Sequence, residues 1–303
     1  MRRLDPSELF ELDPDRPPLD APILVQALDG FIDAGGAKRL LREHLLTTYA
    51  SRALVTFDVD QLLDYRARRP AMLFVEDHWE TYEDPQLAVH LLHDDVGTPF
   101  LLLAGPEPDV QWERFSAAVT MVVDRLAVRL TVGLNAIPMG VPHTRPTGVT
   151  AHGSRPELVA GYLPWVNAVQ VPGTAGHLIE YRLGQSGHDA VGFAVHVPHY
   201  VAQAEYPAAA SALLAEVVKA TGLTLSAQAL DEAAATTRQA IDDQVQESPE
   251  VAGVVAALEG QYDAFISGRD TSLLAGDTPL PTADELGAEL ERFLAEQHQD
   301  PPT

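Results

Sequence analysis

Short apolar runs that fit buried strands alternate along this chain with segments that have the apolar spacing of helices. The first run, residues 23–28, is followed by a glycine-containing turn over residues 29–36 and by a helical stretch to about residue 49. Strands that alternate with helices predict an α/β fold with a mostly parallel sheet covered on both faces. Further strands are expected at residues 54–59, 71–75, 86–93, 100–104, 130–137, 148–151, 168–171 and 190–197, and further helices at residues 112–128, 156–162, 175–183 and 207–220.

Two regions depart from this alternation. Residues 1–22 are rich in Asp and Pro and are expected to form an irregular lead-in. The closely spaced strands over residues 71–104 indicate a mixed sheet that contains a hairpin.

The last quarter of the chain differs in character from the rest. Residues 226–246 are expected to form a helix, and Ser248-Pro249 is typical of the start of a second helix that runs to about residue 266. A linker follows at about residues 268–281, and the capping box Thr282–Glu285 predicts a last helix to about residue 296. We therefore divide the chain into an α/β domain, residues 1–225, and a C-terminal helical extension, residues 226–303. The apolar residues of this extension fit one buried face, within the chain or between chains: Val245, Val251, Val254, Val255, Leu258, Tyr262 and Phe265.

The charge of the chain limits the partners that it can have. The 303 residues carry a formal net charge of −24, and residues 222–303 contribute −13 of it, from 16 acidic and 3 basic residues. An acidic protein repels a phosphate backbone, so nucleic acid is not an expected partner.

Two further absences bear on the class of protein. No stretch reaches the roughly 20 consecutive apolar residues of a membrane-spanning helix, and the N-terminus lacks the apolar stretch of a secretory signal. The sequence contains no cysteine, which excludes disulfides and thiolate chemistry. We therefore expect a cytoplasmic protein with no membrane partner.

The turn after the first strand is the first candidate ligand site. In open α/β sheets ligands bind beyond the carboxyl ends of the strands, where Gly35 and Gly36 would let a ligand approach the backbone. Asp29, Gly30 and Asp33 complete this set. The order of residues matches neither G-x-G-x-x-G nor a Walker A sequence. The alternative is that the glycines serve chain geometry and Asp33 caps a helix.

Histidines at strand and helix ends are the second candidate. His177 and His199 are the two that we add to the ligand-binding set. The pair His196 and His199 has a chelating spacing, but it lies at a strand end before a proline, and no metal signature such as H-E-x-x-H is present. Because a G-x-S-x-G elbow is also missing, we assign no catalytic residue, metal or cofactor.

Four stretches taken together resemble the PAC2 family, relatives of the proteasome assembly chaperones. They cover the family core and the helical extension of its actinobacterial branch, and the similarity spans about residues 20–265. The stretches are residues 28–36 (LDGFIDAGG), 171–184 (VPGTAGHLIEYRLG), 191–200 (VGFAVHVPHY) followed by 206–210 (YPAAA), and 244–251 (QVQESPEV) with 258–263 (LEGQYD).

The resemblance implies a three-layer α/β/α sandwich like that of nucleoside phosphorylases and hydrolases, and self-association, as a trimer. Archaeal and eukaryotic members assist the assembly of proteasome α-subunit rings. The family has no agreed catalytic residues, so none is carried over. Members that dock on proteasomes can end in a hydrophobic residue, tyrosine and any residue. This sequence ends Asp300-Pro301-Pro302-Thr303, which argues against docking in that mode.

Three functions follow as hypotheses. The first is a homo-oligomeric protein-binding module that acts as a proteasome-assembly-chaperone-like factor on proteasome α-subunits. The second is a small-molecule-binding protein or an enzyme that uses the strand-end cleft, in which case the candidate residues should line one pocket. The third is a purely structural oligomer.

Overall fold

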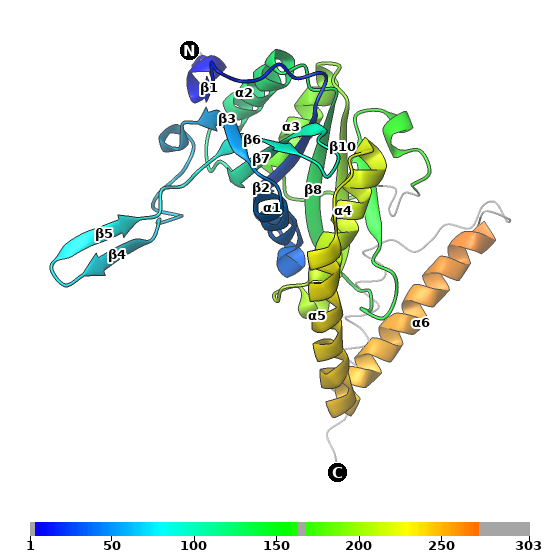
Figure 1. Ribbon diagram of the computed structural model, residues 1–303. Helices are drawn as coiled ribbons and strands as arrows, with labels where there is room; N and C mark the ends of the chain where they lie inside the picture. The colour runs from blue at the N-terminus through cyan, green and yellow to red at the C-terminus, as the bar shows by residue number, and fades with distance from the viewer. Residues whose placement is uncertain (1–3, 163–167, 273–303) are drawn as a thin grey trace.

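A sheet of eight strands forms the centre of the computed structural model, which describes residues 4–162 and 168–272 (Figure 1). Its strands are β1 (Phe10–Leu12), β2 (Ile23–Asp29), β3 (Arg52–Phe57), β6 (Ala88–His93), β7 (Pro99–Pro106), β8 (Leu130–Met139), β9 (Val149–Gly153) and β10 (Ala190–Pro198). They lie in the order β1-β3-β6-β7-β2-β8-β10-β9. The central strands β7, β2, β8 and β10 run parallel, and the outer strands pair antiparallel. The predicted α/β class with a mixed sheet is confirmed.

Helices cover both faces of this sheet and make the three layers. The helices are α1 (Ala37–Thr48), α2 (Trp112–Arg125), α3 (Ala175–Gln185), α4 (Pro207–Thr221), α5 (Gln228–Glu247) and α6 (Pro249–Ser272). Buried residues of α1, α4 and α5 form one core cluster with one face of the sheet. Buried residues of α2 and α3 form a second cluster with the other face.

Strand β2 shows how the sequence produces this double burial. Its residues alternate between the two clusters: Ile23 and Val25 belong to the cluster under α1 and α4, whereas Leu24 and Leu28 belong to the cluster under α2 and α3. A strand buried on both faces is apolar almost throughout. Gln26 is the exception, and the alternation places it on the α3 side.

The structure corrects several expectations about the edges of the fold. The lead-in, expected to be irregular, contains strand β1, which pairs with β3. Buried Leu9 and Phe10 pack into the second cluster and hold this segment on the body. Residues 168–171 form no strand, since Val169 and Val171 are exposed. The expected helix at 156–162 is a short 3-10 turn, η4 (Pro156–Val159).

A separate hairpin projects from the sheet. Strands β4 (Met72–Val75) and β5 (His78–Tyr82) pair only with each other and extend away from the body (Figure 1). The sequence pattern predicted the first of these strands but not the second.

The helical extension packs on the body through part of its apolar residues. Leu230 and Ile241 of α5 join the first core cluster, and Val255 of α6 is buried. Val251, expected on the buried face, is exposed together with Val254. Helix α6 continues to Ser272, past the predicted start of the linker, and the helix expected at residues 282–296 lies outside the described residues. Within the described part of the chain, no helix has the length and apolar character to cross a membrane.

Candidate functional site: a polar recess under helix α3

A row of four positions crosses the sheet in register. Gln26 on β2 is paired with Gly133 on β8, Gly133 with Gly192 on β10, and Gly192 with His152 on β9. The two glycines leave a trough between the polar ends of the row. A Cβ on Gly192 would lie 2.1 Å from Cε1 of His152 and 2.6 Å from Oε2 of Glu180, so only glycine leaves room for these side chains.

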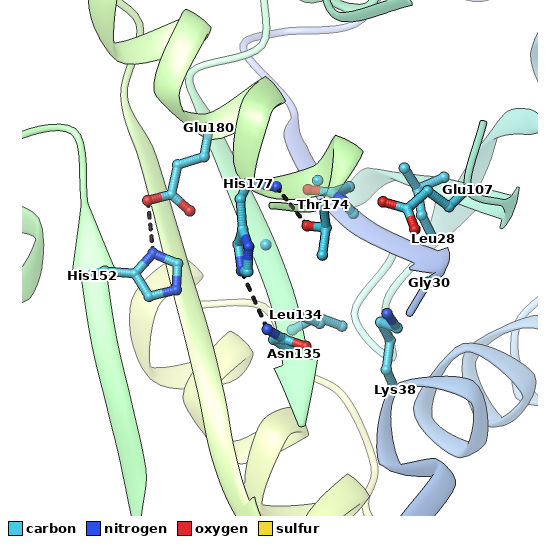
Figure 2. Close-up of a pocket in the computed structure, with 13 residues that line it drawn as sticks. Leu28, Gly30, Lys38, Glu107, Leu134, Asn135, His152, Thr174, His177 and Glu180 are labelled. Carbon is cyan, nitrogen blue, oxygen red and sulfur yellow. Dashed lines mark hydrogen bonds and ion pairs between the residues drawn. The ribbon is translucent and has the colours of Figure 1, made fainter. Parts of the chain in front are cut away.

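Helix α3 lies over this trough. Its N-cap, Thr174, accepts a hydrogen bond at 3.1 Å from the backbone N–H of His177. A Cβ on Gly176 would lie 2.3 Å from Nε2 of Gln26, so the helix can approach the sheet this closely only with glycine there. This close approach brings His177 and Glu180, which are one turn apart, toward the row (Figure 2).

His152 and Glu180 form a carboxylate–imidazole pair at one end of the recess. Nδ1 of His152 lies 2.7 Å from Oε1 of Glu180. The carboxylate only accepts hydrogen bonds, so Nδ1 carries the proton. Nε2 is the ring nitrogen that this pair leaves unengaged.

His177 is held in the same tautomer by a different partner. The side-chain oxygen of Asn135 accepts the backbone N–H of Ala136 at 3.0 Å, so its NH₂ group faces Nε2 of His177 at 3.2 Å and donates to it. The imidazole is therefore neutral, with its proton on Nδ1. Burial lowers the pKa of His177, and the neighbouring His152 lowers it further.

Lys38 and Glu107 occupy the deep end of the recess, where both are almost fully buried. Lys38 comes from the first turn of α1, and Figure 2 shows it pointing toward Glu107. Burial lowers the pKa of Lys38, and the carboxylates of Asp33, Asp29 and Glu107 oppose that shift. Oε1 of Glu107 accepts the backbone N–H of Ala175, the first residue of α3, at 2.5 Å.

The recess opens toward a larger cavity. The enclosed space beside Lys38 is about 30 Å³. The adjoining cavity of about 590 Å³ shares His152, His177 and Glu180 with it. The site thus combines a small polar end with a wider outer part. The described residues contain no group of three side chains suited to hold a metal ion.

The structure brings together two of the seven residues chosen from sequence. Gly30 and His177 line the recess. Asp29 instead pairs with Arg42, and Asp33 accepts the N–H groups of Lys38 and Arg39 at the start of α1, at 2.8 and 2.9 Å.

The other three residues also lie outside the recess. Gly35 and Gly36 adopt left-handed backbone conformations, with φ of 65° and 58°. A Cβ on Gly35 would lie 2.8 Å from Cβ of Tyr206, so this turn needs glycine for close packing. His199 is exposed in the short turn η5 (His199–Val201).

The sequence analysis missed most of the residues that line the recess. Gln26 carried a readable signal, because it is the one polar residue among apolar neighbours in a strand expected to be buried. Asn135, in the middle of another predicted strand, carried the same signal. Lys38, Glu107 and Glu180 had none, since charged residues at helix and strand ends are usually exposed.

The parallel core, the covering helices and the recess at the carboxyl ends of the strands define a three-layer α/β/α protein with a helical extension. The chain belongs to the PAC2 family, whose sequence profile matches residues 27–245. No curated protein matches it at a significant level.

Three of the similar solved structures are actinobacterial proteins. A Mycobacterium tuberculosis protein of unknown function, Rv2714, is 52% identical with a TM-score of 0.81, over 86% of this chain and 92% of that one. A Corynebacterium glutamicum protein of unknown function is 37% identical with a TM-score of 0.81, over 85% and 98%. The M. tuberculosis proteasome-assembly chaperone homologue Rv2125 is 25% identical with a TM-score of 0.71, over 77% and 99%.

Proposed function

We propose that this chain is a homo-oligomeric protein-binding module, a trimer that acts as a proteasome-assembly-chaperone-like factor. The observation that carries the proposal is the apolar hairpin formed by β4 and β5. Five of its large apolar side chains are 48–62% exposed: Met72, Leu73, Phe74, Trp79 and Tyr82. Large exposed apolar side chains gathered on one element mark a surface that binds another protein.

The geometry of the hairpin supports the same proposal. An isolated two-stranded hairpin is marginally stable in water, and this one is held together by the rings of Phe74 and Trp79, whose centroids are 5.1 Å apart. Docking on a neighbouring protein would bury these rings and stabilise the hairpin. The likeness to a proteasome-assembly chaperone homologue supports a proteasome α-subunit as the further partner.

Native mass spectrometry of the purified chain, alone and mixed with proteasome α-subunits from the same organism, tests this function. We expect a trimer that captures α-subunits. A trimer that does not bind α-subunits would support the oligomer but contradict the chaperone role. A monomer at micromolar concentration would overturn the proposal as a whole.

A second candidate function is the binding of a small molecule in the recess under α3. The observation that favours it is that the buried side chains of Lys38 and Gln26 line the recess and form no hydrogen bond with a described residue. Denaturing the freshly purified protein and analysing the released material by mass spectrometry tests this function. A small molecule released in stoichiometric amount supports it, and its absence at every preparation counts against it.

A further inference from the structure

The side chains of two buried polar residues at the deep end of the recess have no hydrogen bond and no close ion pair with any described residue. Gln26 and Lys38 are each 6% exposed. No described carboxylate oxygen lies within 4.0 Å of the Lys38 ammonium, and no described group forms a hydrogen bond with this ammonium or with the Gln26 side chain. Burying such groups without partners costs free energy. Both therefore present hydrogen-bond donors to the space that they line.

Most carboxylates around Lys38 are already engaged elsewhere. Asp29 pairs with Arg42, Asp33 accepts two N–H groups of α1, and Glu180 holds His152. The negative charge that would balance the Lys38 ammonium is therefore not supplied by these groups at short range.

Glu107 adds a single acceptor to the same space. Its Oε1 is occupied by the N–H of Ala175. Its Oε2 would lie 3.1 Å from a Cβ built on Gly30, and Nζ of Lys38 would lie 3.6 Å from that same point. An ammonium and a carboxylate oxygen thus face one small space beside Gly30 without pairing with each other.

The size of that space limits the group that fits it. The space open to the centre of a water-sized atom in the recess is about 30 Å³. A few polar atoms of a ligand therefore fit. The adjoining cavity of about 590 Å³, with Val171 and Tyr181 on its wall, has room for a larger part of the same molecule.

We propose that the recess binds a free α-amino acid in its zwitterionic form. The carboxylate would accept hydrogen bonds from Lys38 and Gln26, the ammonium would donate to Oε2 of Glu107, and the side chain would lie in the outer cavity. A simple carboxylate would leave Glu107 facing a like charge, and a simple amine would leave Lys38 unpaired. This proposal rests on the second candidate function, small-molecule binding, and not on the oligomer.

Thermal unfolding of the full chain, with each proteinogenic L-amino acid as probe, tests the proposal. At a concentration about 100-fold above Kd, a bound amino acid should raise Tm by about 5 °C. The des-amino acid and the amide of the same side chain should bind at least about tenfold more weakly, since each lacks one of the two charges. No shift with any amino acid, or equal shifts with the des-amino acid, would overturn the proposal.

Two variants locate the binding. Gly30→Ala places a methyl group between Lys38 and Glu107, and Lys38→Met removes the ammonium but keeps the stem. Both should abolish the shift in Tm. Lys38→Met should also raise Tm of the unliganded protein, because it removes a buried unpaired charge. Lys219→Met, at a lysine whose side chain is 63% exposed, is the matched control and should bind normally.

The outcomes separate this proposal from the function on which it rests. If both recess variants bind the amino acid as well as the native chain does, the ligand lies elsewhere and the proposal is wrong. If the purified protein releases a stoichiometric small molecule that is not an amino acid, small-molecule binding stands and the amino-acid assignment falls.

Discussion

Asn135 donates its side-chain N–H to Nε2 of His177 across 3.2 Å, which holds the imidazole in the neutral form with its proton on Nδ1. The orientation of the Asn135 amide follows from its second bond, to the N–H of Ala136. His152, 5.9 Å away between ring centroids, is oriented by a carboxylate instead. Two neighbouring histidines therefore carry the proton on the same nitrogen, Nδ1, which an amide donor to Nε2 fixes in His177 and a carboxylate acceptor at Nδ1 fixes in His152.

The neutral state of His177 predicts a dependence of stability on pH. Its folded pKa lies below the ordinary value of 6.5 because of burial. The unfolded chain therefore takes up a proton at a higher pH than the folded chain, and this group makes the protein less stable as pH falls from above 6.5 through the folded pKa.

His177→Gln keeps an acceptor for Asn135 but cannot titrate. Urea unfolding at about pH 7.5 and about pH 5.5 should show a smaller loss of stability on acidification for this variant than for the native chain. Burial also lowers the pKa of His90, so His90 adds to the loss of stability on acidification in both proteins. An equal loss in the two proteins would mean that His177 is protonated in the folded state.

We predict that no side chain larger than that of glycine fits at position 192 in the cross-strand row. Gly192→Ala would place a methyl group 2.1 Å from Cε1 of His152, and because the site is packed on both sides we expect a loss of about 3 kcal/mol in the free energy of unfolding. The control is Gly253→Ala in α6, where a Cβ meets nothing within 4 Å. Alanine should stabilise that helix by about 0.5–1 kcal/mol. Equal effects at the two positions would contradict the packing described for the trough.

The sequence predicted the layers well because they depend on local pattern. Residues 23–28 are apolar on both faces, and such a run has few alternatives to a strand buried in a parallel sheet. The site depends instead on register between strands that are distant in the sequence. Nothing local to Gln26, Gly133, Gly192 or His152 indicates that they are neighbours across four strands.

In the turn after β2, the sequence pattern was noticed but the structure gives some of its glycines another role. Its glycines were chosen for a ligand, yet Gly35 has a left-handed backbone and packs against Tyr206. Gly35 shapes the start of helix α1, and this start places Lys38 in the recess. Asp33 holds the same helix start by accepting the backbone N–H groups of Lys38 and Arg39. Of the residues chosen in this turn, Gly30 lines the recess, whereas Asp33 and Gly35 position the start of α1.

The proposed trimer, docked through the hairpin, predicts that the apolar residues of β4 and β5 hold it together. Replacing Phe74 and Trp79 with Glu puts charges into the apolar patch, and we expect the trimer to dissociate to monomers at micromolar concentration. Size-exclusion chromatography with light scattering measures the mass. The control is Val96→Glu, which changes an even more exposed apolar residue, 72% exposed, on the turn between β6 and β7. Dissociation in the control, or none in the hairpin variant, would place the interface elsewhere.

We predict that substitutions at two valines of helix α6 differ in their effect on the docking of this helix. Val255 is 5% exposed and packs toward the body, whereas Val251 is 41% exposed. Arg145 strengthens the same docking through Asp263 at 2.7 Å and Glu259 at 3.2 Å. Val255→Asp buries a charge at a cost of roughly 3 kcal/mol, and release of α6 from the body avoids that cost.

Hydrogen exchange measures this release directly. In Val255→Asp the amides of residues 249–267 should exchange faster, while β8 and β10 keep their protection because the sheet does not depend on α6. Val251→Asp should exchange like the native chain in both regions. If the two variants loosen α6 equally, the difference in burial between Val255 and Val251 does not decide how α6 is held, and this prediction is wrong.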